Sequence, residues 1–478
     1  MFDSELKRAG RRLASPKLAP PCGRSTCDPQ YSGARQPESV ERKTTEGLAN
    51  PSGLWHQSLM YCITFKSVLN KVQPIKGFVY ESVRYSAVAD DTIEAAVVAR
   101  NGSKARCSQC GRACPTYDHA DRPRVWLMPP FFQFALVLIY TMRRVDCPLC
   151  GVVVEKVPWG TGKYGLCDGF RLFLAHWARK LSWEEVAVSF KVSWADVYSS
   201  VQWVVDYGLK HRVLENIRAI GVDEICVRVG RVFWTLIYQI DDHMTRLLWV
   251  GHDRKEQTLL AGLNSLGEEV CAGIRFVCSD MWEPYLRAVK KRLTALHILD
   301  RFHIRQLLNK AVDEIRKGEA RAMAQAGLMP RLKKLRWALL KNRKNWTAKE
   351  RRRMSDLKYS GLAAIRAFWL VAAFDHFWGY LSPTWAGKFL DAWCRKVRRS
   401  RLAPLKKAAK SLAKHREVLL NYFRAKKTIS GGVIEGLNNK VKVTFRRSYG
   451  FRTDKAREIA LFHVLGKLPE PQVIHGFF

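Results

Sequence analysis

The chain has 478 residues, and 47% of them are hydrophobic, which fits a globular protein of two or three domains. Its 81 Lys and Arg residues outnumber 43 Asp and Glu residues, so the formal net charge is +38. Such a surplus repels itself in a compact state unless a polyanion neutralises it, and because it is spread along the chain we expect nucleic acid rather than an acidic membrane surface as the partner.

The sequence argues against a membrane protein and a secreted protein. Its longest apolar run, residues 131–140, is far shorter than the ~20 residues that span a bilayer, and we expect it to form a buried strand. No apolar core follows the charged N-terminus, so no signal peptide is expected. We therefore expect a cytoplasmic, nucleoid-associated protein whose thirteen cysteines are reduced and available to bind metal.

The N-terminal segment, residues 1–59, is rich in Pro, Gly, Ser and Arg and has no hydrophobic period. This composition predicts a disordered basic extension. It is either a basic arm or a result of start-codon choice, with Met60 as the true start.

Residues 60–165 contain strand-like segments, including 93–100, and are expected to form a β domain. Within them lie two CxxC pairs, each directly followed by Gly: Cys107 with Cys110, and Cys147 with Cys150. Four thiolates on two such turns could hold Zn²⁺ in tetrahedral geometry. A redox-active CxxC is the alternative, and Cys114 is an alternative ligand, but two pairs in tandem favour structural zinc.

Residues 166–210 are predicted to form a helix-turn-helix. Two capping-box patterns begin eleven residues apart, in Ser182 with Glu185 and in Ser193 with Asp196. The second helix would offer three side chains to a DNA groove: Trp194, Tyr198 and Ser199. Lys191 stands where a turn glycine is usual, and an ordinary helical hairpin is the alternative.

Residues 211–303 are predicted to form an α/β unit. The expected strands lie at 220–229, 232–241, 246–253, 274–282 and 295–303, with a helix at 257–266. Asp223 interrupts the first strand and Asp280 ends the fourth. Acids at such positions are costly unless a cation neutralises them, and Mg²⁺ or Mn²⁺ would do so.

Residues 304–428 become helical and strongly basic, and residues 429–465 then carry one more acid-bearing helix before a tail at 466–478. Ser430 is the expected N-cap of that helix. Taken alone, Glu435 would be a salt-bridge partner on a basic surface. Six neighbouring side chains on the same helix are expected to bind DNA: Asn438, Asn439, Lys440, Lys442, Arg446 and Arg447.

Asp223, Asp280 and Glu435 together suit phosphodiester chemistry. Cleavage and transfer need an activated water or 3′-hydroxyl, an in-line leaving oxygen and charge neutralisation at phosphorus. Two Mg²⁺ ions supply all three, and three carboxylates suffice to hold them because phosphate and water complete the coordination. No Walker lysine loop is present, so ATP dependence is not indicated.

Five motifs resemble the DDE transposases of bacterial insertion sequences in the ISL-three group: GVDEI (221–225), SDMWEPY (279–285), LDRFH (299–303), SPTWAGKFLDAWC (382–394) and GVIEGLNNKVKVTFRRSYGF (432–451). The resemblance covers roughly residues 60–478 and implies an RNase H-like core, at 211–303 and 429–465, interrupted by a helical insertion. It also implies that Asp223, Asp280 and Glu435 are the catalytic acids. Asp300 matches a recurrent family position with no settled role, and it is kept as a structural or auxiliary acid.

The resemblance implies binding and joining of transposon ends, and hence at least a dimer on DNA. Two alternatives remain. A sequence-specific DNA-binding repressor would have no use for acids at strand ends, and an RNase H-like nuclease would not need a separate sequence reader.

Overall fold

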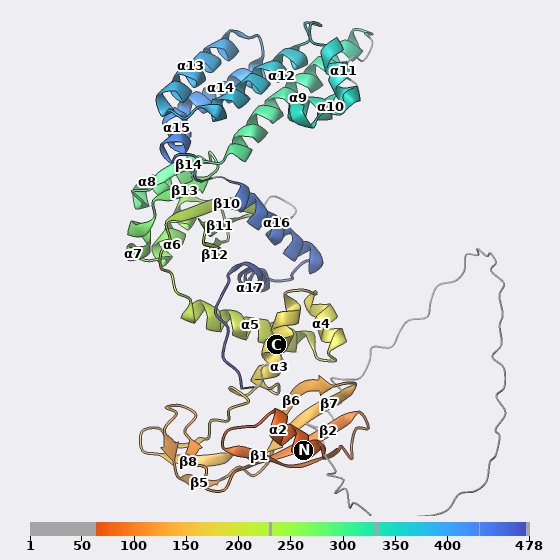
Figure 1. Ribbon diagram of the computed structural model, residues 1–478, viewed down its shortest axis with the longest axis vertical. Coiled ribbons are helices and arrows are strands. Elements are labelled where there is room, and N and C mark those ends of the chain that lie inside the picture. The colour runs from red at the N-terminus through yellow and green to blue at the C-terminus, as the bar shows by residue number, and fades with distance from the viewer. Residues whose placement is uncertain (1–63, 229–231, 329–331, 333, 430, 475–478) are drawn as a thin grey trace, which may run out of the picture. The chain divides into compact units, whose positions relative to one another are not determined.

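The computed structural model describes residues 64–228, 232–328, 332, 334–429 and 431–474 (Figure 1). The predicted extension at 1–59, Met60 and the predicted N-cap Ser430 lie outside these residues. The chain divides into two compact units. One holds the described residues up to Ala178 with Trp183–Val197 and the residues from Gln472, and the other holds Arg179–Ser182 and Tyr198–Pro471.

The first unit is built on a four-stranded sheet in the order β1-β2-β7-β6. Its elements are α2 (Phe65–Val72), β1 (Phe78–Tyr85), β2 (Thr92–Ala99), β6 (Arg124–Phe131) and β7 (Phe134–Tyr140). The predicted strand at 93–100 is confirmed. The run at 131–140, predicted as one strand, is divided between two: Phe131 ends β6 and β7 begins at Phe134, because Phe132 adopts a left-handed φ of 53° in the turn between them.

Shorter strands form two small sheets beside this one, β3 with β4, and β5-β8-β9. They are β3 (Ala105–Arg106), β4 (Ala113–Cys114), β5 (Thr116–His119), β8 (Arg143–Cys147) and β9 (Gly151–Val154). Glu155 accepts hydrogen bonds from Arg143 Nη2 at 2.7 Å and from the Tyr140 hydroxyl at 2.5 Å, all buried. The hydrogen bond from Tyr140 therefore ties the Arg143–Glu155 ion pair of the β5-β8-β9 sheet to β7.

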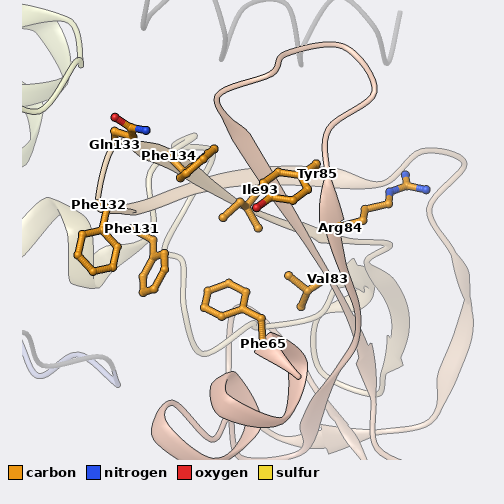
Figure 2. Close-up of a pocket in the computed structure, with 9 residues that line it drawn as sticks. All are labelled: Phe65, Val83, Arg84, Tyr85, Ile93, Phe131, Phe132, Gln133 and Phe134. Carbon is orange, nitrogen blue, oxygen red and sulfur yellow. The ribbon is translucent and has the colours of Figure 1, made fainter. Parts of the chain in front are cut away.

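Aromatic side chains line a cavity of about 670 Å³ in the first unit (Figure 2). They come from α2, β1 and the turn between β6 and β7, and include Phe65, Tyr85, Phe131, Phe132 and Phe134. Phe132 is 86% exposed. The described residues that line the cavity include no acid, cysteine or histidine.

Three helices follow: α3 (Asp168–Ala178), α4 (Trp183–Ser189) and α5 (Trp194–His211). The two predicted helix starts are therefore present. The turn after α4 needs no glycine, because Lys191 itself takes a left-handed φ of 52°. The Val192 amide then donates to the Ala187 carbonyl at 3.0 Å, which closes the helix end.

The second unit is built on a five-stranded sheet in the order β12-β11-β10-β13-β14. Its strands are β10 (Ala219–Arg228), β11 (Val232–Asp241), β12 (Met244–Gly251), β13 (Phe276–Ser279) and β14 (Leu296–Leu299). β10, β11 and β12 pair antiparallel in succession, and β10, β13 and β14 pair parallel. A strand is present at each of the five predicted places in residues 211–303. The last two are shorter than predicted: β13 ends at Ser279, and β14 ends at Leu299 because Asp300 caps the helix that follows.

The two faces of this sheet carry different helices. Side chains alternate along β10, so Ile220 and Val222 pack with α6 (Glu256–Ser265), α7 (Glu268–Gly273) and α8 (Glu283–Arg292). Gly221 and Asp223 lie on the opposite face, where α16 (Gly432–Arg447) lies along β10 and β11. α17 (Asp454–Leu465) packs against both α16 and β12.

A helical bundle lies between β14 and α16, as predicted for residues 304–428 (Figure 1). It consists of α9 (Arg301–Gln325), α10 (Arg336–Leu340), α11 (Ala348–Asp356), α12 (Ala363–Phe374), α13 (Pro383–Arg399), α14 (Ala403–Lys414) and α15 (Arg416–Arg424). Its apolar core is continuous with Ile298 and Leu299 of β14. In the part of the chain that the structure describes, no helix is long and apolar enough to cross a membrane.

Candidate functional site

Three aspartates lie on neighbouring strands of the second unit. Asp223 is in β10, Asp280 directly follows β13, and Asp300 directly follows β14. Because β10, β13 and β14 are parallel and adjacent, their carboxyl ends share one edge of the sheet. Asp223 and Asp300 are buried, and Asp280 is half-buried.

Glu435 lies in the first turn of α16, and its side chain is exposed. Two glycines allow the helix to approach the sheet closely. A Cβ on Gly221 would lie 2.6 Å from Ile434 Cδ1, and a Cβ on Gly431 would lie 2.0 Å from Asp300 Oδ1. The start of α16 is therefore packed directly against β10 and Asp300.

A chain of buried polar contacts joins α16 to the aspartates. Asn438 Nδ2 donates to Asp223 Oδ2 at 2.5 Å, and the Tyr238 hydroxyl donates to Asn438 Oδ1 at 2.8 Å. On the other side, His303 Nε2 lies 3.7 Å from Asp223 Oδ1 and 3.8 Å from Asp300 Oδ2. Asp300 also caps α9, where its Oδ1 accepts from the Phe302 amide at 2.9 Å.

These contacts shift the charge states of the site. Burial raises the pKa of Asp280 to about 6, with Asp223 and Glu224 adding to the shift. Burial, together with Asp223 and Glu435, also raises the pKa of Asp300. Burial opposes the charged form of His303, but its ion pair with Asp223 and the nearby charges of Asp300 and Asp280 raise its pKa to about 9.

Among the described residues, the imidazolium of His303 lies within 4 Å of Asp223 and Asp300, and the pKa values of Asp280 and Asp300 are nevertheless raised. Oxygen ligands with uncompensated negative charge suit a hard divalent cation such as Mg²⁺. Within the described residues, no group of three or more acids or histidines here brings all its ligand atoms within 4.8 Å. The acids therefore share an edge of the sheet without forming a closed ligand cluster.

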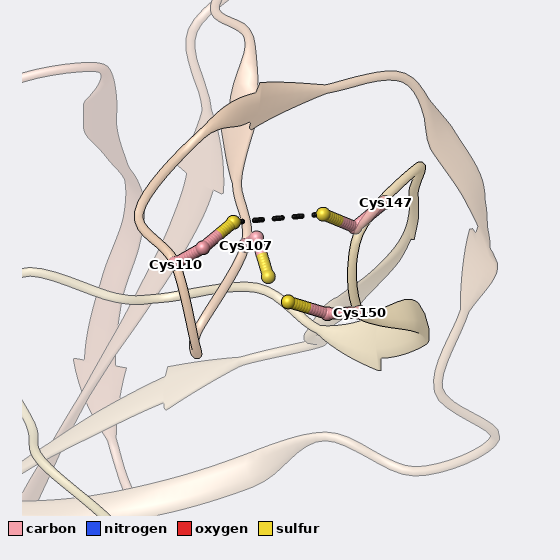
Figure 3. Close-up of side chains that lie close together, drawn as sticks. All are labelled: Cys107, Cys110, Cys147 and Cys150. Atoms are coloured by element: carbon pink, nitrogen blue, oxygen red, sulfur yellow. Dashed lines mark hydrogen bonds between the residues drawn. The ribbon is translucent and has the colours of Figure 1, made fainter.

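The four predicted cysteines do converge. The sulfurs of Cys107, Cys110, Cys147 and Cys150 all lie within 4.8 Å of one another, and Figure 3 shows them pointing to a common centre. Cys110 Sγ and Cys147 Sγ are 3.5 Å apart. The Leu149 amide lowers the pKa of Cys147 to about 6, which favours the thiolate that Zn²⁺ needs.

Cys114 lies in the core beside these cysteines but outside the four-sulfur group. Its sulfur contacts the Arg112 carbonyl at 3.4 Å. Burial, with the neighbouring thiols adding to the effect, raises the pKa of Cys114. The pKa of Cys150 is raised for the same reasons, so the positions of the sulfurs, and not their pKa values, separate Cys114 from the four-sulfur group. The structure therefore supports the two CxxC pairs, not Cys114, as the ligand set.

The predicted DNA-binding residues of α16 occupy different environments. Asn439, Lys440, Lys442 and Arg446 are exposed. Asn438 is buried, with 8% of its surface exposed, and its side-chain amide is hydrogen-bonded to Asp223 and Tyr238. The prediction that Asn438 contacts DNA is therefore corrected to a contact inside the protein. Arg447 is half-buried, and its Nη1 donates to the carbonyls of Arg179 and Lys180 at 2.7 and 3.0 Å.

The predicted groove-facing residues lie at the start of α5. Trp194 is 44% exposed, and Tyr198 and Ser199 are half-buried. Ser193 caps this helix as predicted, since its Oγ accepts from the Asp196 amide at 3.1 Å.

Sequence reasoning missed His303 and Tyr238. His303 could have been found, because it lies three residues after Asp300 at the start of a helix and so shares a face with it. Tyr238 gave no such signal, since its partner Asn438 lies 200 residues away in the sequence.

Comparisons with known proteins agree with this geometry. A DDE transposase family profile of the ISL3 type, described as "Transposase", matches residues 220–458. A second profile, "zinc-finger of transposase IS204/IS1001/IS1096/IS1165", matches residues 103–150, which contain the cysteine group.

Two curated relatives are transposases. The transposase for insertion sequence element IS1001 of Bordetella parapertussis is 25% identical over 351 residues, covering 72% of this chain and 85% of that protein. The transposase for insertion sequence element IS1557 of Mycobacterium tuberculosis is 26% identical over 392 residues, covering 76% and 86%.

Proposed function

The chain belongs to the ISL3 family of DDE transposases, and we propose that it binds insertion-sequence ends and catalyses metal-dependent DNA cleavage and strand transfer. The single observation that carries this proposal is the meeting of Asp223, Asp280 and the start of α16 at one edge of the sheet. These residues lie within the segment that matches the family.

We assign the second unit an RNase H-like core. The sheet order β12-β11-β10-β13-β14, with three antiparallel strands followed by two parallel ones, supports this assignment. The helical bundle then interrupts the core between β14 and α16. The proposed domains are the zinc-binding β domain at 60–165, the helix-turn-helix at 166–210, the core at 211–303 and 429–465, and the insertion at 304–428.

Asp223, Asp280 and Glu435 are the proposed Mg²⁺ ligands. Bound Mg²⁺ would supply charge neutralisation at phosphorus and activation of the attacking hydroxyl. Within the protein, His303 compensates Asp223 and Asp300, while Asp300 fixes the start of α9. The exposed carboxylate of Glu435 is free to meet a DNA-bound ion at the open side of the site.

DNA binding is assigned to two surfaces. Lys440, Lys442 and Arg446 on α16 would bind phosphates beside the acids, because they are exposed on the helix that carries Glu435. The tight turn between α4 and α5 supports a helix-turn-helix that reads the transposon end, with Trp194 at its exposed start. Zn²⁺ bound by Cys107, Cys110, Cys147 and Cys150, which together form the zinc ribbon, would stabilise the fold of the β domain around them.

Strand transfer separates this function from its alternatives. Purified protein is mixed with Mg²⁺, a labelled transposon end and a target plasmid, and joined products are resolved on a gel. A transposase joins the labelled 3′ end to target DNA, a nuclease yields nicks without joining, and a repressor yields only a shifted band. Because two ends must be held together, we also expect at least a dimer on DNA, which light scattering of the end complex measures.

A further inference from the structure

The side chain of Asn438 lies inside the protein between two elements that are far apart in sequence. Its Nδ2 donates to Asp223 Oδ2 of β10 at 2.5 Å, and its Oδ1 accepts from the Tyr238 hydroxyl of β11 at 2.8 Å. Asn438 is 8% exposed and Tyr238 is fully buried. Loss of either hydrogen bond among Asp223, Asn438 and Tyr238 would leave a buried polar group without a partner, which costs free energy of folding.

The chemistry of the three groups fixes the direction of both hydrogen bonds. The carboxylate of Asp223 can only accept, so the Asn438 amide must present its nitrogen. Its oxygen then faces Tyr238, which must donate. Burial and the charge of Asp223 raise the pKa of Tyr238 well above its ordinary value, so the hydroxyl keeps its proton.

The position of Asn438 on α16 gives this trio a consequence. Asn438 lies three residues after Glu435, close to one helical turn. Holding Asn438 against Asp223 therefore sets both the rotation of the helix about its axis and its height along β10. The same contact occupies Oδ2 of Asp223, while Oδ1 accepts from the Glu224 amide at 2.8 Å and lies 3.7 Å from His303 Nε2.

We propose that Asn438 is a positioning residue that aligns Asp223 with Glu435 in the metal site. Tyr238 acts through Asn438, because its hydroxyl fixes the orientation of the Asn438 amide. This inference rests on the proposed function. Asn438 touches the metal ligand Asp223 and does not itself meet the metal or DNA. Partners that orient metal ligands in this way typically change metal affinity or activity by about 10–100-fold when removed.

The test is metal binding in the absence of DNA. Mn²⁺ is titrated into the full-length, zinc-loaded protein, and free Mn²⁺ is followed by its paramagnetic resonance signal. Wild type, Tyr238→Phe, Asn438→Ala and the double variant are compared, and Asp223→Asn identifies the Mn²⁺ that belongs to this site. We expect Tyr238→Phe to weaken this binding about tenfold or more, with unchanged circular dichroism.

Tyr285→Phe is the matched control. Tyr285 is also fully buried, and its hydroxyl is hydrogen-bonded at 2.7 Å to Thr235 on the same strand as Tyr238. Its removal costs a buried hydrogen bond of the same kind without touching Asn438. We expect Mn²⁺ affinity to remain at the wild-type value in this variant.

The double variant separates positioning from general weakening of the fold. If Tyr238 acts through Asn438, the double variant binds Mn²⁺ as weakly as Asn438→Ala alone. Additive losses, or wild-type Mn²⁺ affinity in Tyr238→Phe, would overturn the inference while leaving the proposed function standing. Wild-type protein that binds no Mn²⁺ sensitive to Asp223→Asn would overturn both.

Discussion

At the scale of single residues, His303 compensates part of the negative charge of Asp223 and Asp300 when no metal is bound. Its Nε2 lies within 4 Å of both Asp223 and Asp300, at 3.7 and 3.8 Å. The pKa of His303 rises to about 9 in the folded protein, against about 6.5 for an unperturbed histidine. Folding therefore favours protonated His303.

This shift predicts a particular pH dependence of stability. A raised folded pKa contributes stability that is fully present below about pH 6.5 and is lost as the pH rises through about 9. Asp280 has a pKa of about 6, so it titrates mostly below the range from pH 6.5 to 9 in which His303 loses its proton. In zinc-loaded protein without Mg²⁺ or Mn²⁺, wild type should exceed His303→Gln in urea midpoint at pH 6, and the difference should disappear by pH 9.5. A difference that stays constant over this range would contradict the assigned charge of His303.

Two neighbouring arginines show what the sequence alone could not provide. Arg446 and Arg447 have the same chemistry and follow one another on a basic helix, so both were predicted to bind DNA. Arg446 is exposed, whereas Arg447 donates to the carbonyls of Arg179 and Lys180. Their difference depends on which turn of the chain packs beside α16, and no local pattern records that packing.

At the scale of elements, alternation and strand-end acids were enough to predict the five strands of the second unit and the position of Asp223 and Asp280 among them. The short helices α7 and α8 were not predicted. The docking of α16 could not be derived from the helix itself, because it depends on contacts such as that of Gly221 with Ile434, across 213 residues of sequence.

That docking makes a testable prediction. Gly221→Ala places a Cβ 2.6 Å from Ile434 Cδ1, and overpacking of this kind costs about 1–3 kcal/mol. The urea midpoint and strand transfer should both fall, and adding Ile434→Val should restore part of each. Gly436→Ala is the control on the same helix, since a Cβ there meets nothing within 4 Å; it should stabilise the protein by about 0.5–1 kcal/mol. Equal losses of urea midpoint and strand transfer in the two alanine variants would argue against close packing of α16 on β10.

The zinc ribbon is an element that spacing predicted and the fold bears out in its four converging sulfurs. We expect one Zn²⁺ per chain by elemental analysis of the purified protein. Cys147→Ser should lose the metal and lower the melting temperature of the first unit, because structural zinc contributes directly to folding. Cys114→Ser, which changes a neighbouring thiol outside the four-sulfur group, should keep it. Zinc loss in the Cys114 variant would require a different ligand set.

At the scale of the whole molecule, the charge of +38 should be visible as a steep dependence of DNA binding on salt. Each phosphate contact adds about 0.9 to the slope of log K against log salt concentration. Replacing Lys440, Lys442 and Arg446 together by Gln should therefore reduce the slope by about 2–3. Arg447→Gln should lower stability instead and leave the slope unchanged. A wild-type slope in the triple variant would mean that this face of α16 is merely solvated.

In the proposed site, Glu435 completes the set of metal ligands with Asp223 and Asp280, although the helical bundle separates it from them in the sequence. The most direct measurement is Mg²⁺-dependent strand transfer by Glu435→Gln, with end binding followed in the same samples. Glu417→Gln is the control, because Glu417 is exposed on α15 and pairs with Arg416 and Arg424. We predict that Glu435→Gln binds the transposon end as wild type does and joins none of it to target DNA, while Glu417→Gln remains active. Strand transfer by Glu435→Gln at the wild-type rate would contradict the account.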